Sequence, residues 1–193
     1  MLTTNQKGTV AELAVALAAS KLGVGVYRPV NDGERYDMIL EIRGRLLRVQ
    51  CKSAPRYANG VVIRCYSSRR ARTGLIRRIY TCAEVDAIAA YSADLDRCFL
   101  VPMNVIEGHR ELRLRLEPTR NNQRQGIRWG DDFDFAARIR DLQGAIAQLG
   151  ERLHGMQEVA GSSPAGSILR LGYFSAKTTS RMSASETSSG CAG

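Results

Sequence analysis

The first regular pattern of apolar residues along the chain has the period of a helix. Small and apolar side chains recur at spacings of three and four residues, at Val10, Leu13, Ala14, Leu17 and Ala18. Gly23 follows this pattern and is a common helix terminator. We therefore predict a helix over residues 4–22, with these side chains on one face.

The segments that follow are short, rich in β-branched residues and bounded by turn residues, a pattern typical of β-strands. We predict strands at 24–30, 36–42, 46–52, 61–66, 85–91, 97–101 and 112–116. A basic loop is expected at 67–78 and a short closing helix at 131–142. This order of elements indicates a mixed α/β (α+β) domain, with a central sheet of about five or six strands and flanking helices.

The composition changes after Gln143. Residues 144–193 hold eight Gly and nine Ser, few large apolar residues and no clear period. Such a segment buries too little surface to offset the entropy of ordering it. We therefore expect a folded domain over residues 1–143 and a disordered, Gly/Ser-rich tail over 144–193 that has no function. Residues 144–168 also resemble a bacterial tRNA gene translated in one frame, which implies that the tail was never selected to fold.

Composition argues against several classes of protein. No apolar run reaches the ~18 residues of a membrane span, and the N-terminus lacks the basic-then-apolar layout of a secretory signal. The five cysteines include no C-x-x-C pair and are accompanied by only two histidines, which argues against a disulfide scaffold and a structural zinc site. We expect a cytoplasmic bacterial protein with no membrane partner, associated with the nucleoid when it binds DNA.

Positive charge is concentrated in one stretch of the chain. The net charge is +9, and the 42 residues from Ile42 to Ala83 contain eleven Lys and Arg but no Asp or Glu. These cations repel one another unless a polyanion lies against them, which favours nucleic acid as the partner. A compositional bias explains why the chain has 24 Arg and 4 Lys, but it does not explain the missing carboxylates.

The two predicted strands on either side of Gly44-Arg45 form a hairpin with two different faces. With that two-residue loop, Asp37 lies opposite Lys52. Because side chains alternate along a strand, one face of the hairpin is apolar, and the other carries Asp37, Gln50 and Lys52 toward one end.

An acid, an amide and an amine in this arrangement suit the hydrolysis of a phosphodiester. Oxygen ligands hold a hard divalent cation that binds phosphate and activates water. A nearby ammonium can orient that water or neutralise charge on the phosphorane. The same spacing also fits an ordinary surface hairpin, in which Asp37 and Lys52 form a cross-strand pair worth roughly 0.3 kcal/mol. The residue types and spacing alone leave both interpretations open.

Several blocks of the sequence together resemble the PD-(D/E)XK endonuclease superfamily. Tyr36-Asp37 followed by Val49-Gln50-Cys51-Lys52 resembles its core signature, and is most similar to intron-associated (group I intron) homing endonucleases in which glutamine replaces the second acid. The other matching blocks are Lys7-Gly8 with Glu12, residues 85–88 with 99–102, and Asn121-Asn122-Gln123 through Trp129. The resemblance covers about residues 3–140 and implies the restriction-endonuclease-like fold.

This resemblance implies an active site that uses Mg²⁺, for which Mn²⁺ can substitute. Asp37 would be the main metal ligand, Glu12 a second acidic group, and Cys51 a ligand through its backbone carbonyl. Gln50 would stand where the usual acid stands, and Lys52 would be the catalytic lysine. The chain departs from the common motif at Tyr36, where the motif has proline, and at the neutral Gln50, which should weaken metal binding.

The residues expected to contact DNA are mostly basic and lie outside the core signature. They are Lys7, Arg56, Arg69, Arg70, Arg72, Arg77, Arg78, Asn122 and Arg124. Arginines can track phosphates or read guanine in the major groove. The asparagine is equally compatible with the capping of a turn.

These features together predict a metal-dependent endonuclease that hydrolyses phosphodiester bonds in double-stranded DNA. Cutting both strands of a near-palindromic site needs two active sites, so we expect a homodimer or a tetramer. Two alternatives remain open. A Holliday-junction resolvase would share the core and the basic surface but cut branched DNA, and a catalytically inactive relative would bind DNA without cleaving it.

Overall fold

The computed structural model describes residues 2–31, 33–119, 121 and 123–157. The predicted tail beyond residue 157 therefore lies outside the described residues. Along the chain the first elements are α1 (Thr4–Lys21), β1 (Gly25–Tyr27), β2 (Met38–Ile42), β3 (Arg45–Ser53), β4 (Arg56–Tyr57) and β5 (Gly60–Arg64). They are followed by β6 (Tyr66–Ala71), β7 (Gly74–Ile79), β8 (Ala87–Ser92), β9 (Arg97–Pro102), α2 (Met103–Ile106), β10 (Glu111–Arg115), the 3₁₀ turn η1 (Asp131–Phe133) and α3 (Phe135–Gln157).

Helix α1 begins at a capping box. The Thr3 hydroxyl accepts a hydrogen bond from the Gln6 backbone N–H, and the Gln6 side chain accepts one from the Thr3 N–H at 2.8 Å. The helix lies where we predicted it, but its buried face was assigned wrongly. The side chains that pack inward are Ala11, Val15 and Ala19, whereas Leu13 and Leu17 are exposed. Small residues allow the helix backbone to approach the sheet closely, which the larger leucines would prevent.

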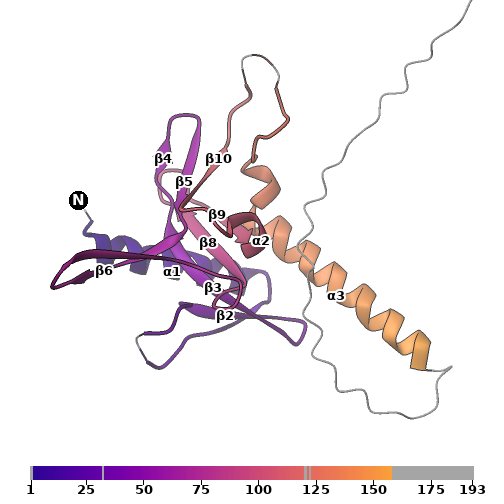
Figure 1. Cartoon of the computed structure of the whole chain (residues 1–193). Coiled ribbons are helices and arrows are strands. Elements are labelled where there is room, and N and C mark those ends of the chain that lie inside the picture. Colours follow the sequence, from indigo (N-terminus) through magenta and orange to yellow (C-terminus); the bar gives the residue numbers. More distant parts are fainter. Residues whose placement is uncertain (1, 32, 120, 122, 158–193) are drawn as a thin grey trace, which may run out of the picture. The chain divides into compact units, whose positions relative to one another are not determined.

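The central sheet has five strands in the order β1-β2-β3-β8-β9, which confirms the predicted mixed α/β fold (Figure 1). Only β3 and β8 run parallel within it, and the other neighbours are antiparallel. One face packs against α1 and the first turns of α3, through residues such as Val15, Val49 and Phe135. The other face is covered by β5 and β10, which contribute Ile63 and Leu114 to a second core.

The turn between β2 and β3 differs from the predicted one. The two loop residues are Arg43 and Gly44, both with positive φ (49° and 77°), as a type I′ turn requires. Ile42 therefore pairs with Arg45, and the register is shifted by two residues from the prediction. A shift of two leaves every side chain on its predicted face, whereas a shift of one would have reversed the faces.

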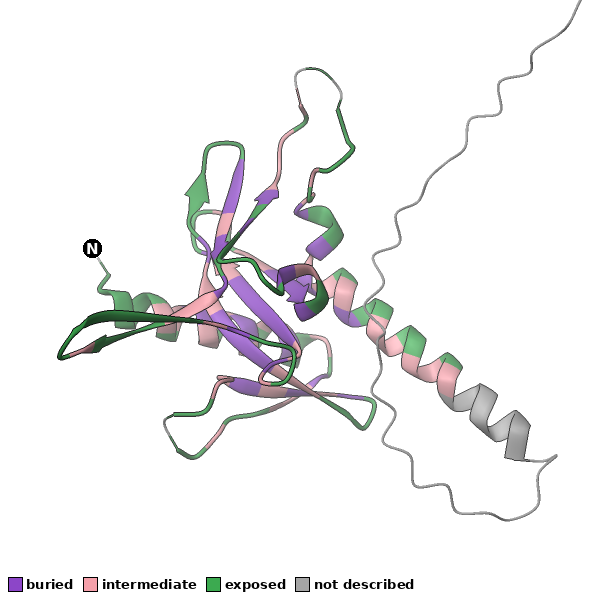
Figure 2. Cartoon of the chain, viewed as in Figure 1, coloured by how far each residue is buried: buried purple, intermediate pink, exposed green. Residues whose placement is uncertain are grey.

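The predicted basic loop at 67–78 is a β-hairpin instead. Strands β6 and β7 pair from Tyr66 with Ile79 to Ala71 with Gly74 and form a two-stranded sheet of their own. No strand residue of this hairpin is buried and most are exposed, in contrast to the buried strands of the central sheet (Figure 2). Without a buried face it has no apolar alternation, which is why the sequence pattern did not predict its strands.

Helix α3 extends well beyond the predicted domain end. We expected a helix to residue 142 and an irregular tail from 144, but the helix continues to Gln157. Ile146 explains part of this extension, because it packs against the same core as Ile139 and Leu142. No helix in the described part of the chain is both long and apolar enough to span a membrane.

Candidate active site

The Asp37 carboxylate lies just before β2 and is held by the facing strand β3. The Asp37 backbone N–H donates to the Val49 carbonyl, which continues the strand pairing. The Asp37 Oδ2 accepts hydrogen bonds from the Cys51 backbone N–H (2.7 Å) and from the Gln50 side-chain amide. Burial raises the pKa of Asp37, although the Cys51 N–H and the Lys52 charge oppose that rise. This carboxylate is thus held in place within a partly dehydrated pocket.

Gln50 bridges the two groups that we predicted as metal ligands. Its side chain is 8% exposed, and its Nε2 donates both to Asp37 and to the Cys51 carbonyl oxygen, the latter at 3.3 Å. One amide group thus holds together the negatively charged Asp37 carboxylate and the partially negative Cys51 carbonyl oxygen. A cation placed between the same oxygens would compete directly with that amide.

Glu12 approaches the same group of side chains from α1. Burial raises its pKa, and the charge of Asp37 raises it further, so the two carboxylates act on each other electrostatically. Arg28 partly offsets this, because its guanidinium lies 3.4 Å from the Glu12 carboxylate and its charge lowers the pKa of both acids. Arg28 was not predicted from the sequence, since no motif or spacing distinguishes it from the chain's other arginines.

Lys52 reaches the site from β3, one residue beyond Cys51. Burial lowers its pKa, while the nearby Asp37 charge raises it. Its Nζ donates a hydrogen bond to the Tyr80 hydroxyl at 2.9 Å. Tyr80 was not predicted either, because it lies 28 residues further along the chain than Lys52, beyond the segment that was predicted as a loop.

The available donors suit a hard divalent cation. Glu12, Asp37, the Cys51 carbonyl and the Gln50 amide offer only oxygen ligands, which is the chemistry that Mg²⁺ prefers. Among the described residues there is no cluster of three or more His, Cys, Asp or Glu side chains suited to a metal ion. Gln50 contributes an amide rather than a carboxylate to this set of residues.

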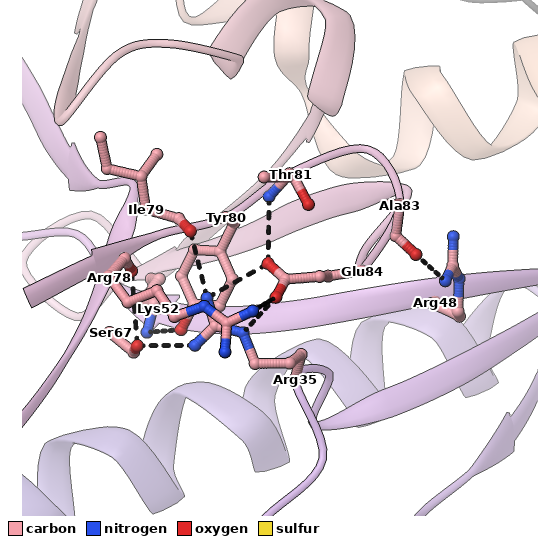
Figure 3. Close-up of polar contacts among 10 residues, drawn as sticks. All are labelled: Arg35, Arg48, Lys52, Ser67, Arg78, Ile79, Tyr80, Thr81, Ala83 and Glu84. Atoms are coloured by element: carbon pink, nitrogen blue, oxygen red, sulfur yellow. Dashed lines mark hydrogen bonds and ion pairs between the residues drawn. The ribbon is translucent and has the colours of Figure 1, made fainter.

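A polar network surrounds Tyr80 and links it to the β6–β7 hairpin (Figure 3). Arg35 donates to the Ser67 hydroxyl on β6 (2.7 Å) and to the Ile79 carbonyl on β7 (3.2 Å), and it lies 3.2 Å from the Glu84 carboxylate. Glu84 also binds Arg78 and the Thr81 N–H. Burial alone would raise the pKa of Glu84, but Arg35 and Arg78 bring it below its ordinary value.

The hairpin arginines predicted to contact DNA lie on two opposite faces and at the tip. Pairing puts Arg70 and Arg77 on one face and Arg69 and Arg78 on the other, and Arg72 is in the turn. All five are exposed. Because Arg78 is paired with Glu84, it is less available to a phosphate than the other four.

The remaining predicted DNA contacts lie on other elements. Lys7 is exposed on α1 and Arg124 is exposed beyond β10. Arg56 lies on β4, where its guanidinium is 2.9 Å from the Glu117 carboxylate. Asn122 lies outside the described residues.

Comparison with known proteins agrees with this geometry. The model of a family described as PD-(D/E)XK endonuclease matches residues 2–136. A solved structure described as that of a bacterial homing endonuclease, I-Ssp6803I, superimposes with a TM-score of 0.62 at 25% sequence identity. That match covers 76% of this chain and 99% of the other. No curated protein matches the sequence.

Proposed function

The chain belongs to the PD-(D/E)XK endonuclease family, and we propose that it is a divalent-metal-dependent endodeoxyribonuclease that cuts both strands of duplex DNA. The observation that carries the proposal is the meeting of Asp37, Gln50, the Cys51 carbonyl and Lys52 at the end of one hairpin. The structural likeness to a homing endonuclease supports a site-specific activity.

The residues of the site have separate roles in this proposal. Asp37, Glu12 and the Cys51 carbonyl would hold Mg²⁺, and Mn²⁺ fits the same oxygen donors. When bound, the cation supplies positive charge at the phosphate and a more acidic water. Lys52 brings an ammonium close to Asp37, where it can neutralise charge that develops on the phosphate.

The Gln50 amide can either hydrogen-bond to its neighbours in the site or contact a bound cation. Without a cation its amide N–H groups keep Asp37 and the Cys51 carbonyl together. A carboxamide also has an acceptor oxygen, with which Gln50 could help to hold a bound cation. We infer that Gln50 preserves the shape of the site at the cost of weaker metal binding.

DNA would lie along the β6–β7 hairpin, which projects from the domain beside the site. Arg69, Arg70, Arg72 and Arg77 are exposed there and can contact phosphates or base edges. Because one such site cuts one strand, cleavage of a duplex needs two copies, and we propose that a homodimer or tetramer acts on the target.

Cleavage of defined DNA classes tests the proposal. A library of linear duplexes and a set of four-way junctions are incubated with the protein, in Mg²⁺ and in EDTA, next to Lys52→Ala. We expect discrete fragments from duplex DNA that require both Mg²⁺ and Lys52. Cutting of junctions alone would assign the protein as a resolvase instead. Tight binding without any cutting would show that the Gln50 site is inactive and that the protein acts by binding.

A further inference from the structure

The Tyr80 side chain joins the protein core to the amine of Lys52. Tyr80 follows β7, is 2% exposed, and its ring belongs to the core that includes Ile63 and Val101. Its hydroxyl faces the other way and accepts the hydrogen bond from Lys52 Nζ at 2.9 Å. A long and flexible lysine side chain is thereby held at its end by a residue that cannot itself move freely.

The chemistry of the Tyr80 hydroxyl is suited to fixing the position of the Lys52 amine. Burial raises its pKa to about 12, so the phenol stays neutral at any physiological pH. A neutral hydroxyl can accept from an ammonium without neutralising its charge. The hydrogen bond therefore fixes the position of the Lys52 amine without placing an anion beside it.

Arg35 connects Tyr80 to the base of the β6–β7 hairpin. Its guanidinium lies 4.4 Å from the centre of the Tyr80 ring, a stacking distance. The same guanidinium binds Ser67 on β6 and the Ile79 carbonyl on β7, as well as Glu84 (Figure 3). Arg35 also lies two residues before Asp37 in the chain. One side chain thus touches the hairpin that carries the exposed arginines and the tyrosine that holds Lys52.

We propose that Tyr80 is a positioning residue for Lys52, and that Arg35 makes this position depend on the base of the β6–β7 hairpin. The inference rests on the proposed function, in which Lys52 acts on the DNA phosphate. It predicts that the hairpin does more than bind DNA, because its attachment through Ser67 and Ile79 also determines where the Lys52 amine lies.

Removing the Tyr80 hydroxyl alone tests this role. Tyr80→Phe keeps the ring, its packing and the stack with Arg35. We expect kcat for duplex cleavage to fall by about 10- to 100-fold, since a misplacement of about 1 Å has an effect of that order. KM should stay unchanged, whereas the melting temperature should fall somewhat, because the buried Lys52 amine loses its hydrogen-bond partner. A residue with only a structural role would change the melting temperature and leave kcat unaltered.

Tyr91→Phe is the matched control. The Tyr91 hydroxyl also makes a 2.9 Å hydrogen bond, to Asp96 in the turn between β8 and β9, away from Lys52. This variant should cleave like the wild type. If Tyr80→Phe retains the wild-type kcat while the wild type cleaves, the positioning role is wrong and the proposed function stands.

Arg35→Lys tests the link to the hairpin and serves if Tyr80→Phe fails to fold. The lysine keeps the charge but loses the planar group that stacks on Tyr80 and binds Ser67 and Ile79 at the same time. We expect kcat to fall by about 10-fold with little change in KM. A wild-type kcat in this variant would exclude the coupling through Arg35.

A spectroscopic measurement separates this inference from the proposed function. The chain has only four lysines, so the ¹⁵Nζ signals of labelled protein are few, and the signal missing in Lys52→Ala identifies Lys52. Tyr80→Phe should shift that signal, and Tyr91→Phe should not. An unshifted signal in Tyr80→Phe would refute the contact, even in a protein that cleaves no DNA. A shifted signal in a protein that does not cleave would retain the contact and reject the function.

Discussion

The two hairpins β2–β3 and β6–β7 have connections of the same length but opposite surroundings. Both have a two-residue connection. In β2–β3 one face is buried in the core, with Met38, Leu40 and Val49 fully enclosed. In β6–β7 no strand residue is buried, and the base is held by polar contacts to Arg35. In the proposed function, the hairpin with a buried face holds the active site, and the solvated hairpin presents positive charge to the DNA.

The largest difference between the hairpins should appear when apolar side chains are truncated. Leu40→Ala removes fully buried atoms and should lower the free energy of unfolding by about 2–5 kcal/mol. Ile76→Ala, at a position that is 48% exposed, should change it by no more than about 0.5 kcal/mol. Urea denaturation measures both. Similar losses would mean that β6–β7 packs against the domain more than its exposure indicates.

Introducing the same acid into each hairpin should have different effects on stability. Gln50→Glu places a third carboxylate beside Asp37 and Glu12, and removes an amide that donates to Asp37. We expect the metal-free variant to lose about 1–3 kcal/mol, because a buried group is left without its partner. Ser68→Glu, on the exposed hairpin, should stay within about 0.5 kcal/mol of the wild type.

Adding Mg²⁺ should separate Gln50→Glu from the wild type further. It should raise the melting temperature of Gln50→Glu more than that of the wild type, since an added carboxylate strengthens a site for a divalent cation. Differential scanning fluorimetry with and without Mg²⁺ measures the shift. A Mg²⁺ response that is equal in both proteins would place the metal away from Gln50.

The exposed hairpin should contribute to affinity rather than to stability. Replacing Arg70 and Arg77, which share one face, by alanine should weaken DNA binding by about 10-fold, with little change in melting temperature. The slope of log K against log salt should fall by about 2, because about one counterion is released per phosphate contact. Fluorescence anisotropy at several salt concentrations tests this.

The control for the hairpin arginines removes the same amount of charge elsewhere. Lys21→Ala combined with Arg140→Ala affects two exposed cations on α1 and α3. If this control lowers the salt slope as much as the hairpin variant does, DNA attraction depends on net charge, and the hairpin has no special role.

The smallest expected effect concerns the turn of β2–β3. Arg43 has a φ of 49°, a conformation in which asparagine is less strained than arginine. Arg43→Asn should therefore stabilise the protein by a few tenths of a kcal/mol, about 0.5 at most. A measurable loss of stability would indicate that the turn is not of type I′ and that the register differs from the one described.

The sequence predicted the β2–β3 hairpin much better than the β6–β7 hairpin. The alternation of residues 37–42 and 47–52 placed Asp37, Gln50 and Lys52 correctly on one face, because burial of the other face makes the pattern strict. The pairing partner was wrong by two, since the position of Gly44 within a two-residue turn is not determined by alternation. The strands of β6–β7 were not predicted at all, because a ribbon exposed on both faces needs no apolar period.

The predicted site was incomplete for a related reason. Glu12 was found only through a family resemblance, and the electrostatic effect of Asp37 on its pKa agrees with that resemblance. Arg28, Arg35 and Tyr80 come from loops and strand ends whose approach to the site depends on the tertiary fold. A single arginine or tyrosine belongs to no motif with a fixed spacing. Local sequence patterns therefore could not distinguish these three residues from the chain's other arginines and tyrosines.

Cleavage by Asp37→Asn tests the central claim most directly. The variant keeps the shape of the carboxylate but removes its charge, and Asp96→Asn, at a turn position with a φ of 46° that asparagine tolerates, is the control. With duplex substrate and Mg²⁺, we expect Asp37→Asn to cleave about 1,000-fold more slowly or not at all, but to bind DNA as tightly as the wild type. Asp96→Asn should cleave normally. Wild-type cleavage by Asp37→Asn would show that the β2–β3 hairpin does not carry the active site.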